Sequence, residues 1–197
     1  GEYTGKVTIT ASGAQNSPQT VQVKFTVVAT APQITSVANA ASGATGLGAI
    51  SAGTILTIKG RNLGPQTGQT AQVTNNMLPT ELAQVRLLVG GVPGALLYVS
   101  ENQINFAATF GIAGAASTSI VVEYRGQRSA ATTITLTDAS PGIFTADASG
   151  TGPGAILNQN FSLNTANNAA EAGSIVSAFG TGFGLLQPIP ADGSIVT

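Results

Sequence analysis

The sequence predicts an all-β protein built from antiparallel β-sandwiches in tandem, the second of them incomplete. Apolar and polar residues alternate with a period of two in short stretches such as GKVTITA (5–11) and TVQVKFTV (20–27). No stretch shows the 3.6-residue period of an amphipathic helix. A glycine-bounded strand and turn, SAGTILTIKGRNLGP at 51–65, returns without a gap 120 residues later as EAGSIVSAFGTGFGL at 171–185. Such a repeat indicates one supersecondary unit used twice.

The composition excludes several classes of function. Of the 197 residues, 43% are hydrophobic, which is enough for a buried core, whereas 8% are charged and the net charge is −1. Binding of nucleic acid depends on neutralising phosphates, so we expect no nucleic-acid partner. The chain has no cysteine and no histidine, which removes disulfides, thiolate ligands and the commonest general base. No apolar run approaches the ~18–20 residues of a membrane-spanning helix.

The first 29 residues predict a hairpin that ends a preceding module. Strands at 5–11 and 20–27 flank the turn-rich segment SGAQNSP. Val21, Val23 and Phe25 fall on one face of the second strand. Two strands alone are marginally stable in water, so this hairpin needs a sheet to join.

Residues 30–137 predict one complete sandwich. After the linker at 29–32, the strand QITSVANA leads through a Gly/Ala/Ser-rich loop at 42–53 to the repeated strand at 55–59. Residues 65–80 are polar and irregular. About seven short strands at this spacing are typical of a sandwich, and the later ones are expected at 85–89, 95–99, 103–107, 117–124 and 128–136.

Residues 138–197 predict a partial second module. Pro141-x-Ile143 echoes Pro32-x-Ile34 and restarts the pattern. This copy carries extra residues before the repeated strand, including the strand-like AILNQNFSLN at 155–164. It has no counterpart of residues 85–136, and therefore about half the strands that a closed sandwich needs.

Three blocks carry a resemblance to a known family: PQITSVANAASG, ISAGTILTIKGRNLGP and VGGVPGALLYVSENQINF. Together they resemble the IPT/TIG immunoglobulin-like family. They are most similar to the uncharacterised C-terminal domain family of large secreted proteins from Solibacter-type soil bacteria. Residues 1–28 resemble the end of a BACON-type immunoglobulin-like domain. The resemblance implies tandem immunoglobulin-like sandwiches in an extracellular or cell-surface protein, and it implies no catalytic residues and no cofactor.

Two glycine-rich segments, Gly150–Gly154 and Gly180–Gly184, look like phosphate-binding loops. Neither leads into a helix whose N-terminus could hold a phosphate. We therefore interpret both as turns in which glycine allows a positive φ.

Candidate catalytic, sugar-binding and calcium-binding residues are present but scattered. A glycosidase would need two carboxylates facing each other across a cleft, and most acidic residues fall at turns or strand ends. A sugar platform would need exposed aromatic rings, which the core could equally well bury. No D-x-D-type loop gathers the oxygen ligands that calcium would need. The carboxylates are Glu81, Glu101, Glu123, Asp138, Asp147, Glu171 and Asp192, the tyrosines are Tyr3, Tyr98 and Tyr124, and the calcium candidates are Asn75, Asn76, Asp138 and Asp147.

The sequence thus predicts a non-enzymatic extracellular structural or adhesive array, with no metal, cofactor or catalytic residues. A carbohydrate-binding or cell-surface recognition module is the alternative. The two-stranded hairpin and the partial module would both expose unpaired strand edges, which are templates for pairing with another chain. Donation of the hairpin to the partial module of a neighbour would give a head-to-tail filament. Equally, the missing strands could belong to a longer chain.

Overall fold

The structure, a computed structural model, describes residues 1–26, 30–46, 48 and 50–195. Contacts divide the chain into two compact units, Gly1–Thr30 and Ala31–Thr197. Both are built from antiparallel strands. Within the described residues, helical structure is limited to one 3-10 turn, Phe110–Ile112, which agrees with the absence of a helical period in the sequence.

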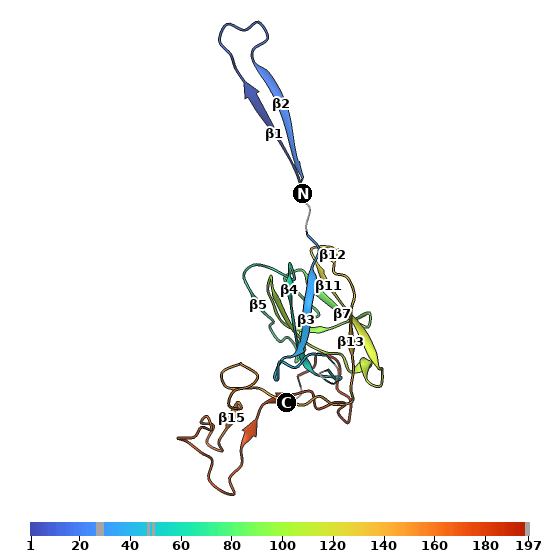
Figure 1. Cartoon of the computed structure of the whole chain (residues 1–197), viewed down its shortest axis with the longest axis vertical. Helices are drawn as coiled ribbons and strands as arrows, with labels where there is room; N and C mark the ends of the chain where they lie inside the picture. The colour runs from blue at the N-terminus through green and yellow to red at the C-terminus, as the bar shows by residue number, and fades with distance from the viewer. Residues whose placement is uncertain (27–29, 47, 49, 196–197) are drawn as a thin grey trace. The chain divides into compact units, whose positions relative to one another are not determined.

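The first unit is the expected hairpin, formed by β1 (Glu2–Ile9) and β2 (Gln19–Thr26) (Figure 1, blue). Cross-strand pairing places Tyr3 opposite Phe25 and Val7 opposite Val21, so that the apolar side chains share one face. Every residue of both strands is exposed. Within its own unit, the hairpin therefore leaves this apolar face uncovered.

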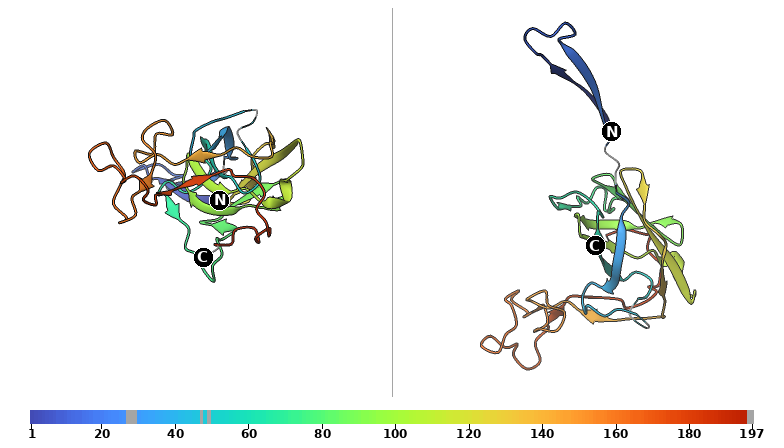
Figure 2. Two further views of the ribbon diagram at one scale, coloured as in Figure 1. Left: turned by 90° about the horizontal axis from the view of Figure 1, so that it is seen from below. Right: turned by 45° about the horizontal axis from the view of Figure 1, so that its top comes forward.

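The second unit contains a complete sandwich of two sheets (Figure 2). One sheet has the strand order β3-β4-β10-β9-β5, and the other has the order β12-β11-β7-β6, with β13 beside β11 and β8 beside β7. The first sheet consists of Gln33–Asn39, Ile55–Arg61, Gln103–Ala107, Ala95–Val99 and Gln69–Thr70 in that order. The second consists of Gln127–Arg128, Ser117–Tyr124, Val85–Val89 and Glu81–Leu82, with Thr132–Thr135 and Val92–Pro93.

The core lies between the two sheets and follows the predicted alternation. Leu56, Ile58 and Phe106 point inward from the first sheet, and Leu87 and Val122 meet them from the second. All five side chains are fully buried. The fold class is therefore confirmed as an all-β, immunoglobulin-like antiparallel sandwich. The expected strand at 128–136 is divided into β12 and β13. Between them, the Ser129 hydroxyl accepts from Val122 N and donates to Ala130 O.

The second copy of the repeat reproduces the strand pairing of the first. In the first copy, Ile34 lies opposite Gly60, and Val37 lies opposite Ile58. In the second copy, β14 (Gly142–Ile143) pairs with β17 (Gly180–Thr181), and β15 (Ile156–Leu157) pairs with β16 (Ser177–Ala178). This pairing puts Ile143 opposite Gly180 and Ile156 opposite Ala178, the positions 120 residues after Gly60 and Ile58.

The extra residues of the second copy are 145–154, not the predicted 155–164. Phe144 N donates to Phe179 O (2.9 Å) and Phe179 N donates to Ala155 O (3.3 Å), so 142–144 and 155–157 act as one interrupted strand. The insertion falls where β3 has its bulge, between Ile34 and Ser36. A bulge already breaks the regular pairing, and added residues there leave the flanking register intact.

The glycine that opens the repeated turn is held by the same two neighbours in each copy. A Cβ on Gly60 would overlap the carbonyl oxygen of Gln33 and lie 3.0 Å from the Leu63 side chain. A Cβ on Gly180 would lie 2.8 Å from the carbonyl oxygen of Gly142 and 2.9 Å from the Phe183 ring. Both positions need glycine because the paired strand passes too close for a side chain.

Candidate functional site

The junction between the two copies is a buried polar contact centred on Asn39. The Asn39 side chain is 1% exposed. Its Nδ2 donates to Ser140 O (2.9 Å), while its Oδ1 accepts from Ala41 N (2.9 Å) and Ser42 N (3.3 Å). A buried amide with all these partners stabilises one arrangement of the chain, because loss of any partner leaves a buried polar group unpaired.

The turn of the second copy adds further hydrogen bonds to this junction. Ile55 N donates to Thr181 Oγ1 (2.8 Å), and the Ser51 hydroxyl donates to Gly182 O (3.3 Å). Gly182 O also accepts from Ser140 N (2.7 Å). Gly182 has φ = +82°, and the equivalent residue of the first copy, Asn62, has φ = +54°. The Gly180–Gly184 segment is thus a tight turn that binds the neighbouring sandwich, which supports the turn interpretation over a phosphate loop.

The C-terminal tail leaves the second copy and returns to the first sandwich. Leu78 N donates to Gly193 O (2.8 Å), and Ile195 N donates to Asn76 O (2.7 Å). The Asp192 carboxylate accepts from Phe110 N (2.7 Å) and from the Thr109 hydroxyl at the start of the 3-10 turn. The tail therefore joins the two copies at a second place.

A groove of about 580 Å³ lies on the outer face of the β3-β4-β10-β9 part of the first sheet. Four polar side chains on β4 and β10 form its floor and bond to one another. Gln103 Nε2 donates to Asn105 Oδ1 (2.9 Å), Thr57 Oγ1 donates to the same oxygen (3.2 Å), and Lys59 Nζ donates to Gln103 Oε1. Leu97 and Phe144 provide apolar walls, and the insertion contributes its residues 148–150.

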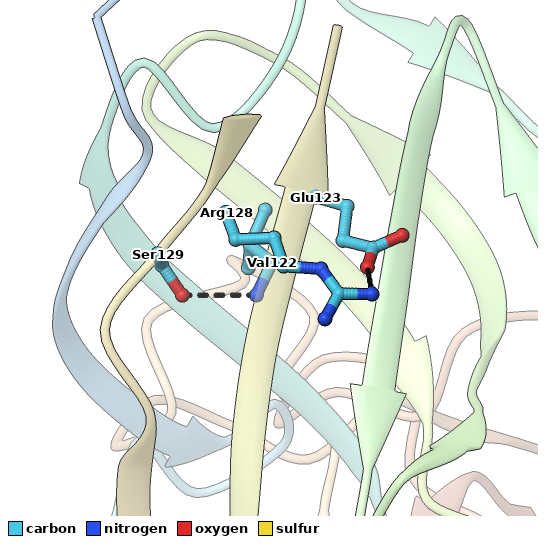
Figure 3. Close-up of polar contacts among 4 residues, drawn as sticks. All are labelled: Val122, Glu123, Arg128 and Ser129. Carbon is cyan, nitrogen blue, oxygen red and sulfur yellow. Dashed lines mark hydrogen bonds and ion pairs between the residues drawn. The ribbon is translucent and has the colours of Figure 1, made fainter. Parts of the chain in front are cut away.

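A row of alternating charges crosses the outer face of the second sheet. Strand register places Arg128, Glu123, Arg86 and Glu81 side by side on four neighbouring strands. Figure 3 shows the Glu123 carboxylate directed at the Arg128 guanidinium, with which it forms an ion pair. These side chains and Arg125 line a shallow depression. Because β12 and β6 are the edges of this sheet, charges here oppose edge-to-edge association.

The candidate carboxylates do not form a catalytic pair in a cleft. Glu81 and Glu123 share the depression described above, but Arg86 stands between them in the strand register. The other five are separated: Glu101 is exposed at a turn, Asp138 and Glu171 line two different pockets, Asp147 lies in the insertion, and Asp192 bonds to the 3-10 turn. The arrangement lacks the facing carboxylates on which the glycosidase alternative depends.

The tyrosines do not form a sugar platform. Tyr98 is half-buried, with its hydroxyl packed against Gly68. Tyr124 is half-buried and packs on the core, and the Arg125 guanidinium lies 5.1 Å from its ring centroid. Tyr3 is exposed on the hairpin, in the first unit. Sugar stacking on Tyr98 and Tyr124 is therefore not favoured.

Three of the four calcium candidates have structural roles. Asn75 and Asn76 have φ of +51° and +58° and form the turn between Thr74 and Met77. The Asp147 carboxylate accepts from Ser149 N (3.1 Å) and Ser149 Oγ (2.8 Å), and these bonds lower the pKa of Asp147 below its usual 3.8. Over the residues that the structure describes, no three His, Cys, Asp or Glu side chains are close enough to hold a metal ion.

The repeated strand of the second copy has an open edge. The sequence predicted an unpaired strand edge within 138–197, but it did not predict which residues form that edge. Residues 175–181 bond to 142–144 and 155–157 along one edge only. On the opposite edge, the backbone groups of Val176, Ala178 and Gly180 bond to no other described residue. Val176 and Phe183 are exposed, although their first-copy equivalents, Leu56 and Leu63, are fully buried.

A comparison with protein families finds a match in the central part of the chain. Residues 47–137 match the model of the IPT/TIG domain. The match covers a little under half of the chain and includes most strands of the complete sandwich. IPT/TIG domains are generally non-catalytic immunoglobulin-like modules, compatible with a structural or adhesive role. The narrower likenesses, to the Solibacter-type family and to a BACON-type domain, stay predictions.

Two further findings accompany this match. No curated protein matches the chain. Among the residues that the structure describes, no helix has the length and apolar character to cross a membrane. The predicted domain boundaries, with modules at 1–29, 30–137 and 138–197, stay predictions.

Proposed function

We propose that this chain is a non-enzymatic structural or adhesive module of an extracellular protein, joined to neighbouring chains by complementary β-strands. One observation carries the proposal: two apolar β-sheet faces have no cover among the described residues of their own unit. One is the face of the hairpin around Val23 and Phe25, and the other is the face of the second copy around Val176 and Phe183.

The hairpin has a large apolar face, which an isolated two-stranded hairpin leaves exposed to water. Its apolar face carries Tyr3, Val7, Ile9, Val21, Val23 and Phe25, each 46–64% exposed. A two-stranded hairpin is marginally stable in water, whereas packing against a sheet buries this face. Burial contributes about 25 cal/mol for each Å² of apolar surface, so these side chains favour association strongly.

The surface of the complete sandwich suits an array of modules. Charged residues make up 8% of the chain, and its net charge is −1. Side-by-side contact between modules therefore meets little electrostatic repulsion. The hydrogen-bonded junction at Asn39 would hold successive copies in a fixed arrangement under load.

Association is tested by sedimentation velocity over a range of protein concentrations. We expect the wild-type chain to form larger species as the concentration rises. Val21→Lys with Val23→Lys places charges on the apolar face and should leave a monomer. The matched control, Thr20→Lys with Gln22→Lys, adds the same charges to the opposite face and should associate as the wild type does. A wild-type chain that stays monomeric at every concentration would refute association.

The extracellular location is tested separately. An antibody against the sandwich should label intact, unpermeabilised cells of the source organism or detect the protein in the medium. Labelling that requires permeabilisation would contradict the proposal.

The groove on the first sheet favours glycan binding as a second candidate. Asn105 Nδ2 and the remaining Lys59 protons donate to no other described residue, so the groove offers hydrogen-bond donors beside the apolar walls of Leu97 and Phe144. Sugars present acceptors and apolar ring faces, which match these groups. Screening against a glycan array tests it: Asn105→Ala should abolish any binding, and Thr35→Ala, outside the groove on the neighbouring strand, should not.

A further inference from the structure

The loop between β15 and β16 carries the one N-x-Ser/Thr motif in the sequence, Asn160-Phe161-Ser162. This loop projects from the second unit (Figure 1, beside β15). An asparagine followed two positions later by serine or threonine, with no proline between them, is the acceptor motif for attachment of a sugar to the asparagine nitrogen. Such motifs also arise by chance in sequences rich in asparagine and serine. The structure around Asn160 therefore decides whether the motif is usable.

The amide nitrogen of Asn160 is accessible and unengaged. Asn160 is exposed, and its Nδ2 donates to no other described residue. Neighbouring asparagines of the same loop differ. Asn158 Nδ2 donates to Asn168 O (2.9 Å), and Asn164 Nδ2 donates to Asn158 Oδ1 (2.7 Å). The loop holds the amide nitrogens of Asn158 and Asn164, whereas that of Asn160 is available to a modifying enzyme.

The serine of the motif holds the other end of the Asn160 amide. Ser162 N (3.1 Å) and Ser162 Oγ (2.6 Å) both donate to Asn160 Oδ1. The same Ser162 Oγ accepts from Asn168 Nδ2 (2.9 Å) and from Asn158 Nδ2 (3.3 Å). Because two N–H donors occupy the lone pairs of this oxygen, its proton is directed at Asn160 Oδ1. The Asn160 side chain is therefore oriented by its oxygen, which leaves the nitrogen for the sugar.

The surface around Asn160 offers both kinds of contact that a sugar makes. Phe161 is 80% exposed, more than any other large apolar side chain of the described residues. Apolar ring faces of sugars pack on such aromatic rings. Asn160 also lines a depression of about 400 Å³ beside Gln159 and Glu171. The Gln159 side-chain nitrogen and the Glu171 carboxylate bond to no other described residue, so they are free to bond to sugar hydroxyls.

We propose that Asn160 is a modification site that carries an N-linked glycan on its Nδ2. The sugar donor is a sugar activated at C1 as a diphosphate ester. Nδ2 attacks C1, so that the N–C1 bond forms while the bond from C1 to the diphosphate oxygen breaks. Nδ2 loses one proton to a base of the transferring enzyme, and the diphosphate leaves with the electron pair of the broken bond. The inference does not depend on the proposed association of chains, because a monomer can carry the same sugar.

Peptide mass spectrometry of the protein purified from its source organism tests the inference. We expect the peptide that contains Asn160 to carry the mass of one or more sugar residues. Treatment with an amidase that releases N-linked glycans, in heavy-oxygen water, should leave a labelled aspartate at this position. An unmodified Asn160 in the native protein, or sugars found only at other residues, would overturn the inference.

Variants expressed in the same organism test the role of the motif. Asn160→Gln and Ser162→Ala should both lose the sugar, whereas Ser162→Thr, which keeps the motif, should retain it. The matched control is Asn167→Gln, which changes an exposed asparagine of the same loop outside the motif and should retain the sugar. A glycan on Asn160 that persists in Ser162→Ala would show attachment by another route and contradict the inference. Sedimentation of the wild type judges the proposed association separately.

Discussion

The two copies of the repeat have the same local geometry and very different burial. In both, the second residue of the first strand is an isoleucine that lies opposite the glycine of the turn, and that glycine is crowded by the equivalent carbonyl and the equivalent apolar side chain. Yet Leu63 is 0% exposed, and its equivalent, Phe183, is 60% exposed. The difference arises because the second sheet covers the first copy, whereas the described residues of the second copy have no such cover.

This contrast separates two levels of folding. Strand pairing and the turn depend on backbone hydrogen bonds and close approaches between residues near in sequence, and ten inserted residues at the bulge did not change them. Burial of the apolar side chains depends on strands that are distant in sequence, such as those of the second sheet. A repeated unit can therefore keep its strand register and still leave its apolar face exposed.

The largest expected difference between the copies comes from truncating equivalent apolar side chains. Leu56→Ala removes a side chain that is 0% exposed and leaves a cavity, which should lower the free energy of unfolding by about 2–5 kcal/mol. Val176→Ala removes one that is 46% exposed and should change it by less than about 0.5 kcal/mol in the monomer. Urea denaturation at low protein concentration measures both. Equal losses would mean that the second-copy face is covered within one chain.

The next largest difference is expected from replacing the asparagines at equivalent positions of the two copies, Asn39 and Asn158. Asn39→Leu leaves Ser140 O and two backbone N–H groups at the junction without their partner, so we expect a loss of about 1–3 kcal/mol. Asn158 stands at the equivalent place, but bonds within its own loop, to Asn168 O and Asn164 Nδ2. Asn158→Leu should speed hydrogen exchange in 159–174 without changing the denaturation midpoint. A shifted midpoint would contradict this local role.

The left-handed turn position should show a smaller asymmetry. Gly182→Asn keeps a residue that tolerates positive φ, but its Cβ would overlap Ser140 O, so a loss of about 1–2 kcal/mol is expected. Asn62→Gly removes the strain of an asparagine at positive φ, but it also raises the conformational entropy of the unfolded chain. The free energy of unfolding should therefore change by less than about 0.5 kcal/mol. Thermal melts of both variants check the order. If Gly182→Asn proves neutral, the junction does not hold the turn as the structure shows.

The smallest effect is that of acid on the insertion, which only the second copy has. Hydrogen bonds from Ser149 N and Ser149 Oγ lower the pKa of Asp147 in the folded chain. The stabilisation is therefore present above about pH 4 and is lost as the pH falls through the folded pKa. NMR titration should place the Asp147 midpoint below 3.8, and Ser149→Ala should raise it. A midpoint at or above 3.8 in the wild type would contradict these bonds.

Much of the fold was predictable from local patterns. The strands at 85–89, 95–99, 103–107 and 117–124 were expected at the bounds observed, because alternating β-branched residues between turn signals specify a half-buried strand. The insertion was misplaced, because AILNQNFSLN alternates like an independent strand, and only Ile156 opposite Ala178 reveals it as a continuation. The groove and the junction were not predictable, since residues far apart in sequence meet there.

The sequence alone determined the all-β class, the repeat and the positions that need glycine. These features depend on side-chain period and on backbone conformations that few residues adopt. Only the tertiary structure decided which apolar faces are buried, where Asn39 finds Ser140, and which edge of the second copy is open. These features depend on contacts between distant segments, whose geometry no local pattern encodes.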